Sequence, residues 1–250
     1  MLNYDFVRPQ SMNNYASMGI AYYAYYKNLM YQNLEKIIVD KDLNPCLKEV
    51  LEKLKNAKQS DIAKILETLG VNNGPNVTMQ MGKTKGDNYA ETVKISKYDY
   101  SITVSPDYTG ATKLFRAFAL LHEITHAYFH NLVDNYATYP TNMPFDGLPM
   151  LYQAYVVKDY PGGTEAAQHE AMATKYVDII ATALQEYDGN FTTPYQVYKD
   201  LAWSGLLETA AFKKEFPEGS AGYTRIKNRY SCEQRGGTIG SESPVGKPCK

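Results

Sequence analysis

The chain has 250 residues, of which 44% are hydrophobic and 21% charged, so it is long and apolar enough to bury a core. Its 26 Lys and Arg nearly balance its 27 Asp and Glu, which argues against nucleic acid as a partner, since nucleic-acid binding normally requires a basic surface. The apolar stretch 18–30 is too short to span a membrane. No secretory signal is visible at the N-terminus, so we expect a cytoplasmic protein, or a secreted one if the chain is part of a longer protein.

The first 70 residues are expected to form an N-terminal helical part. Apolar residues recur at helical spacing over 13–39, which predicts an amphipathic helix that faces the core. Pro45 suits the first turn of a second helix, with Asn44 as its cap. A third helix is predicted to begin at Ser60 and to end at Gly70.

The pattern changes after the turn residues 72–75. The segments 77–80, 91–96 and 98–104 are rich in β-branched and aromatic residues, and the last two alternate between apolar and polar positions. We therefore predict a small antiparallel sheet over residues 76–104.

The rest of the chain reads as helices separated by loops. Helical spacing predicts helices over 112–133, 165–187 and 194–207, with a loop rich in Pro, Asn and Gly at 135–149. The tail, 216–250, is expected to be irregular. Cys232 and Cys249 flank its Gly-rich part and could form a disulfide bond in an oxidising compartment, with free thiols as the alternative. The sequence thus predicts one mostly helical α+β domain, in which residues 112–207 carry the functional helices.

The strongest motif is the string HEITH at residues 122–126, in the middle of the predicted helix 112–133. Residues four apart on a helix are offset by only ~40° around the axis and ~6 Å along it, so His122 and His126 can bind one metal ion. Glu123 is displaced around the helix, where its carboxylate can take a proton from a metal-bound water without binding the metal. This spacing predicts a zinc-dependent hydrolase.

Catalytic zinc normally has three protein ligands and one open position, so a third ligand is needed. His130 is one more turn along the same helix, which places it ~12 Å from His122 and too far for a shared ion. His169 and Glu170 are better candidates on the helix 165–187. His169 points along the apolar stripe of that helix and Glu170 about 100° away, which favours His169, with Glu170 as the alternative.

The string HEITHAYF at 122–129 resembles the motif helix of SprT-like zinc peptidases, which are zincin-type enzymes. In that group the third ligand is a histidine on a later helix, so the resemblance implies His169. The segments QHEAMA at 168–173 and LAWSGL at 201–206 are similar to an uncharacterised bacterial branch of the same group. The resemblance spans about residues 98–207 and implies a zincin-like fold. If Glu170 is the ligand, the chain instead resembles a gluzincin.

Two features depart from the SprT-like pattern. That group usually places its third histidine about fifteen residues after the second, which here falls near Thr141. Its members also often carry a cysteine zinc ribbon, which three scattered cysteines cannot form. The DNA-linked role of the better-known members is therefore not carried over to this chain.

The expected function is hydrolysis of peptide bonds in a protein or peptide substrate, with Zn²⁺ as cofactor and Glu123 as general base. By analogy with zincins, which commonly bind peptide as an added strand, the strand 101–104 is the expected substrate edge. The alternatives are a zinc-containing binding module without turnover, or an effector or toxin domain released from a longer secreted chain.

Overall fold

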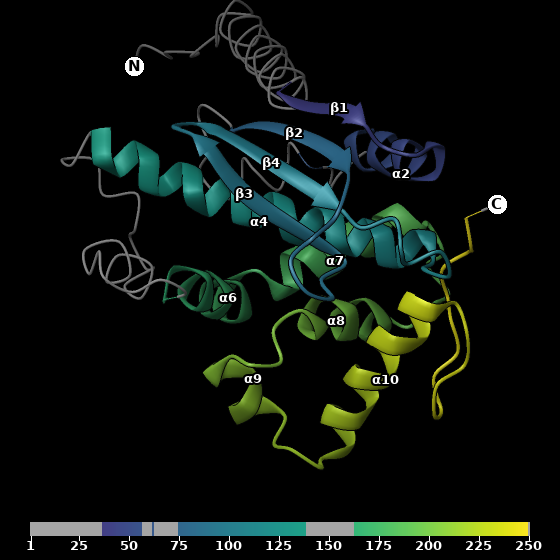
Figure 1. Ribbon diagram of the computed structural model, residues 1–250. Coiled ribbons are helices and arrows are strands. Elements are labelled where there is room, and N and C mark those ends of the chain that lie inside the picture. The colour runs from purple at the N-terminus through teal and green to yellow at the C-terminus, as the bar shows by residue number, and fades with distance from the viewer. Residues whose placement is uncertain (1–36, 57–61, 63–74, 139–162, 250) are drawn as a thin grey trace, which may run out of the picture.

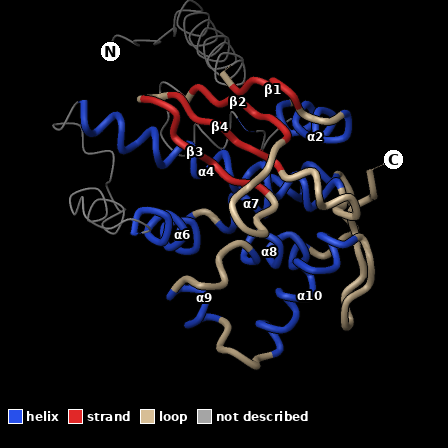
Figure 2. The backbone as a smooth tube through the Cα atoms, in the orientation of Figure 1, coloured by secondary structure: helices blue, strands red, loops and turns tan. Residues whose placement is uncertain are grey.

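The computed structural model describes residues 37–56, 62, 75–138 and 163–249. Within these ranges the chain forms an α+β structure in which a four-stranded sheet lies on one long helix, with shorter helices on the other side of that helix (Figure 1). The backbone trace in Figure 2 shows the same arrangement, with the strands gathered on one side and the helices behind and below them.

The sheet has the order β1-β2-β4-β3 and is mixed. Its strands are β1 (Ile38–Asp42), β2 (Asn76–Met81), β3 (Ala90–Ser96) and β4 (Asp99–Val104). β1 and β2 are parallel, β2 and β4 are parallel, and β3 pairs antiparallel with β4. Alternate residues of β4 are buried, as expected for a strand with one face on the core.

The prediction of an antiparallel sheet is therefore right only for β3 and β4. After β2 the chain passes to the outer position of β3 and returns through β4, which inserts between β3 and β2. Alternation in a sequence predicts a strand and its buried face, but it does not say beside which strand, or in which direction, the strand will lie.

The N-terminal part also differs from its prediction. Residues 38 and 39, expected at the end of a helix, belong to β1, and the rest of that predicted helix lies outside the described residues. The second helix is confirmed as α2 (Pro45–Lys55), where the Asn44 side chain accepts a hydrogen bond of 2.9 Å from the Leu47 amide. Of the third predicted helix, only Ile62 lies in the described residues, and it is helical and fully buried.

The central element is α4 (Lys113–Thr138), which carries the HEITH motif. The sheet covers one side of α4, and α7 (Val177–Asp188) and α8 (Tyr195–Ser204) lie on the other (Figure 1). From Leu114 to Phe129 every residue of α4 is buried. A helix that is buried on all sides carries no single apolar stripe.

The predicted helix 165–187 is present as two helices, α6 (Gly163–Lys175) and α7, which meet at Tyr176. The predicted helix 194–207 corresponds to α8. Beyond it lie α9 (Ala210–Glu215) and α10 (Ala221–Arg235), so the prediction of an irregular tail is wrong for residues 221–235. The predicted loop 135–149 begins inside α4, and its residues from 139 onward lie outside the described ranges.

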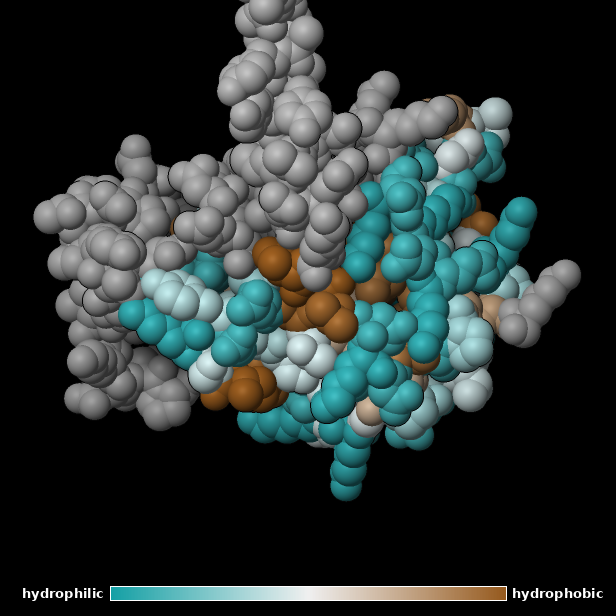
Figure 3. Space-filling model, turned by 90° about the horizontal axis from the view of Figure 1, so that it is seen from above, coloured by the Kyte–Doolittle hydropathy of each residue, from teal (hydrophilic) through white to brown (hydrophobic). Residues whose placement is uncertain are grey.

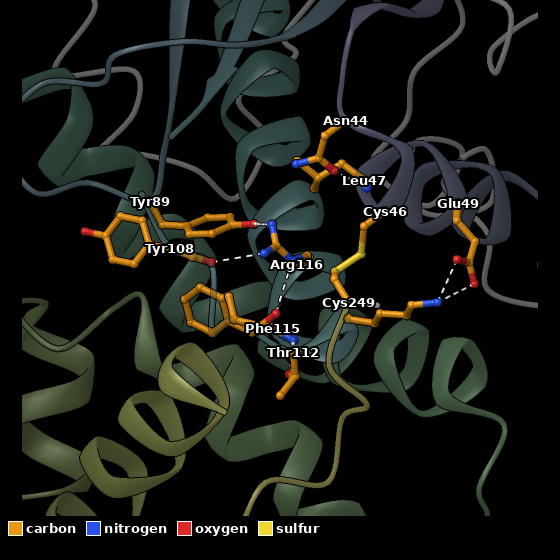
Figure 4. The surroundings of a disulfide bond; sticks show 12 residues. Asn44, Cys46, Leu47, Glu49, Tyr89, Tyr108, Thr112, Phe115, Arg116 and Cys249 are labelled. Atoms are coloured by element: carbon orange, nitrogen blue, oxygen red, sulfur yellow. Dashed lines mark hydrogen bonds and ion pairs between the residues drawn. A yellow bond between two sulfur atoms is a disulfide. The ribbon is translucent and has the colours of Figure 1, made fainter. Parts of the chain in front are cut away.

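Neither alternative for Cys232 and Cys249, a disulfide between them or two free thiols, describes the structure. Cys249 is bonded to Cys46 in the first turn of α2 (Figure 4), whereas Cys232 lies in α10 as a buried free thiol. Close to this bond, the Lys113 side chain pairs with Glu49 at 2.6 Å. The disulfide thus joins the C-terminal segment to α2, beside the start of α4.

The outer face of the sheet is in part apolar. Val39, Val93 and Ile95 are exposed on strands β1 and β3. Figure 3 looks at the molecule from above and shows hydrophobic residues gathered near the middle of that view. Among the described helices, none combines the length and the apolarity needed to cross a membrane.

Candidate metal centre

Two histidines of the motif lie one turn apart on α4 and point to the same place. The Nε2 atoms of His122 and His126 are 3.1 Å apart. Both side chains are buried, with 8% and 7% of their surface exposed. The i, i+4 spacing of the motif therefore brings the two rings together as the sequence predicts.

The third member of the cluster is His169, which comes from α6. Its Nε2 lies 3.2 Å from Nε2 of His122 and 3.0 Å from Nε2 of His126. The three histidines form a group that could hold a metal ion. The three nitrogen atoms thus make a nearly equilateral triangle.

The size of this triangle fits a metal ion such as zinc. Zinc binds imidazole nitrogen at about 2.0–2.1 Å, so two ligands at the tetrahedral angle lie about 3.3–3.4 Å apart. The observed separations of 3.0 to 3.2 Å are only a few tenths of an ångström shorter. Small shifts of the rings would therefore give normal bond lengths.

The protonation state of the three histidine rings favours binding of a metal cation. Burial lowers the pKa of His122 well below its usual value, and the neighbouring His126 and His169 lower it further. Burial likewise lowers the pKa of His126, and it lowers that of His169 to about 4. At neutral pH all three rings are therefore neutral, which is the form that binds metals.

Gln168 orients the second ring of the cluster. Its Oε1 lies 2.5 Å from Nδ1 of His126, and its side chain is buried. An amide oxygen can only accept a hydrogen bond, so Nδ1 carries the proton and the lone pair of Nε2 points into the cluster. Metal-binding histidines are usually held in this way by a partner on their other nitrogen.

Glu123 lies beside the cluster and lines the same cavity. Its Oε2 is 2.7 Å from the hydroxyl of Thr92 in β3, which is also 2.9 Å from the Glu123 carbonyl oxygen. Burial raises the pKa of Glu123 to about 7; the Thr92 hydrogen bond opposes this shift, and Glu165 and Glu91 add to it. A carboxyl group with a pKa near neutrality can both take up and release a proton.

The cavity at the cluster has a volume of about 510 Å³. One wall is β3, from Ala90 to Val93; the others come from the loop before β3, from α4 and α6, from Gly205 after α8 and from Tyr230 of α10. β3 is the edge strand on this side of the sheet, whereas β4 is paired on both sides. The expected substrate edge at 101–104 is therefore wrong, because that strand is internal.

The other two candidate ligands lie outside the cluster. The carboxylate of Glu170 accepts hydrogen bonds from the backbone amides of Ala210 and Ala211, at 2.8 and 3.0 Å, where α9 begins. His130 stacks on the ring of Tyr100, with the ring centres 5.9 Å apart. Of the residues weighed in the sequence as third ligand, the structure brings only His169 to His122 and His126.

The sequence did not reveal three residues that contact this site. Thr92 precedes Glu123 by 31 residues, and Gly205 follows His122 by 83. Gln168 stands directly before His169, but its contact is with His126, 42 residues earlier. Each contact depends on how separate elements pack, so no local residue spacing in the sequence predicts it.

Comparison with protein-family models, with curated proteins and with solved structures finds no match. The features that bear on function are therefore the geometry of the three histidines, Glu123 and the cavity that they share.

Proposed function

We propose that this chain is a zinc-dependent hydrolase of peptide bonds, with His122, His126 and His169 as metal ligands and Glu123 as general base. The observation that carries the proposal is the convergence of three neutral histidine nitrogens within 3.2 Å of one another, beside a buried carboxyl group that binds none of them. Three histidines leave one coordination position open, as catalytic zinc sites do.

The chemistry follows from the residues in the cavity. A bound zinc ion would lower the pKa of a water molecule to about 7 and polarise the substrate carbonyl. Glu123 would take a proton from the attacking water and transfer it to the leaving amine. Thr92 would hold the Glu123 carboxyl group, and Gln168 would hold the His126 ring, so that both keep their positions during the reaction.

The role of Glu123 distinguishes an enzyme from a zinc-binding module without turnover. A site that only binds zinc has no need of a buried carboxyl group next to its ligands, and burying such a group costs stability. The resemblance of the motif helix to SprT-like peptidases supports the same reaction class.

The test is to measure bound zinc, and cleavage of casein and a mixed peptide library, for the wild type and for Glu123→Gln. We expect one zinc per chain in both proteins and a fall in kcat/KM of about 10²- to 10⁴-fold in the variant, the range for loss of a general base. The matched control is Glu208→Gln, which makes the same change at a carboxyl group that is 93% exposed and pairs with Lys213. It should cleave as the wild type does.

Two outcomes would contradict the proposal. Cleavage at the wild-type rate by Glu123→Gln would exclude the assigned general base. Stoichiometric zinc in the wild type, with no cleavage of any library peptide, would indicate a zinc-containing binding module instead.

A further inference from the structure

The loop after α8 reaches the metal cluster at Gly205. This glycine lines the cavity together with His122 and Phe118 of α4. It belongs to the segment LAWSGL at 201–206, to which the proposed chemistry gives no role.

Gly205 lies against the Cε1–Nδ1 edge of the His122 ring, whose Nε2 lies at the cluster. A β-carbon at position 205 would lie 2.9 Å from Cε1 of His122 and 3.0 Å from its Nδ1. It would also lie 3.2 Å from Cζ of Phe118, so the neighbouring ring leaves no room on that side. The absence of a side chain at 205 thus provides the space that the imidazole ring occupies.

The backbone of Gly205 does not itself require glycine. Its φ of −79° and ψ of 0° are open to any residue. What excludes a side chain is therefore space, and the atoms that take this space are mainly those of His122.

We propose that Gly205 is a positioning residue for the metal site, which allows the His122 ring to hold its Nε2 at the cluster. The inference rests on the proposed function in so far as it takes His122 to be a metal ligand. Gly205 touches neither the metal position nor the reacting atoms in this scheme, and it acts only through the ring that it contacts.

The magnitude of the displacement makes the effect measurable. Ordinary contacts of a β-carbon are 3.4 to 4 Å, so the His122 ring would have to retreat by about 0.5 Å to admit an alanine. Metal–ligand distances in zinc sites hold to within about ±0.2 Å. Without metal the ring can turn aside at little cost, whereas a bound ion fixes it in the place that the alanine needs.

The test is Gly205→Ala, with zinc affinity measured by competition with a chelator and with Co²⁺ as a spectroscopic probe of the site. We expect zinc affinity to fall about 10- to 100-fold, the range for loss of a residue that supports a ligand. The visible absorption of bound Co²⁺ should change, because the coordination geometry changes. The melting temperature of the metal-free protein should stay close to that of the wild type.

The matched control is Gly82→Ala. A β-carbon at position 82 would meet Cγ2 of Thr103 at 2.9 Å, the same closest approach, but neither Gly82 nor Thr103 lines the cavity. It should leave zinc affinity and the Co²⁺ spectrum unchanged.

Other results would contradict this inference, the proposed function or both. Wild-type zinc affinity and Co²⁺ spectrum in Gly205→Ala would show that the His122 ring does not need this space. A metal-free variant that melts far below the wild type would make Gly205 a residue of the fold. A wild type that binds no metal would overturn both proposals, whereas a wild type that binds zinc without cleaving peptides would overturn only the hydrolase.

Discussion

His169 and Glu170 are neighbours in the sequence but have different partners in the structure. His169 reaches the nitrogen atoms of His122 and His126, whereas Glu170 accepts hydrogen bonds from two amides at the start of α9. Successive residues of a helix point about 100° apart, so the two side chains serve separate neighbours.

Because the two side chains have different partners, alanine substitutions at His169 and Glu170 should have different effects on zinc binding and on stability. His169→Ala should weaken zinc binding by more than about 100-fold, since it removes a ligand and not merely a supporting contact. Glu170→Ala should keep the zinc and lower the free energy of unfolding by about 1 kcal/mol, because two helix amides lose their acceptor. Zinc content and urea unfolding of both variants check this, and loss of zinc in Glu170→Ala alone would reverse the assignment.

At the residue scale, the sequence was informative where chemistry depends on local spacing. It placed His122, Glu123 and His126 correctly on one helix, because the spacing of the motif is itself helical. It favoured His169 and kept Glu170 as the alternative, because an apolar stripe is a weak guide to a ligand; in the structure that stripe is divided between α6 and α7, which meet at Tyr176. The contacts of Thr92, Gln168 and Gly205 depend on tertiary packing.

Among the elements, the hairpin β3–β4 is fastened to α4 through Asp134. The Asp134 carboxylate pairs with Lys94 of β3, and it accepts hydrogen bonds from the Tyr100 hydroxyl at 2.6 Å and the Tyr98 amide at 3.1 Å. Burial alone would raise the pKa of Asp134, but the hydrogen bonds from these three partners outweigh it and hold the pKa below its usual value. The same hairpin carries Thr92 to Glu123, so this attachment also supports the site.

Asp134→Asn should therefore lower the free energy of unfolding by about 2 kcal/mol at neutral pH, as expected for hydrogen bonds to a buried charge. A lowered folded-state pKa gives stability that is fully present above the unfolded value of about 3.9 and is lost as pH falls through the folded value. The difference from the wild type should thus be constant between about pH 5 and 7 and shrink below about pH 4. Urea unfolding across this range measures it. Asp107→Asn, at an exposed carboxyl group, is the control, and a difference that does not change with pH would refute the role of the ionised group.

Helices and strands could be predicted from the sequence where a single local pattern determines them. The Asn44 cap, the three strands after residue 75 and the long motif helix all follow from local signals. β1 was missed because its first residue, Ile38, continues the helical spacing of the residues before it, and the strand exists only because β2 lies beside it. α10 was missed because most of its residues are polar, and only Ile226, Arg229, Cys232 and Glu233 are buried.

Over the whole molecule, the two ends of the described chain are joined beside the start of α4. The Lys113 amide donates a 2.7 Å hydrogen bond to the Lys247 carbonyl oxygen. Thr112 and Pro248 form an isolated antiparallel β-bridge. The disulfide between Cys46 and Cys249 closes this junction. No sequence pattern predicts it, because the choice among three cysteines depends on which chain segments meet.

The disulfide spans 203 residues of sequence, so it restricts the unfolded chain strongly. We expect Cys46→Ser to lower the free energy of unfolding by about 2–5 kcal/mol, within the range for native disulfides.

Burial raises the pKa of Cys232 to about 11, so this thiol should not react in the native protein. Protein purified without reductant and then denatured should therefore show one reactive thiol, while its native form shows none. Three thiols in the denatured protein would mean that the bond does not form, and an unchanged stability in Cys46→Ser would mean that it does not contribute to the fold. Cys232→Ser is the control for loss of a buried thiol, because it leaves the disulfide intact and changes only the interior of α10.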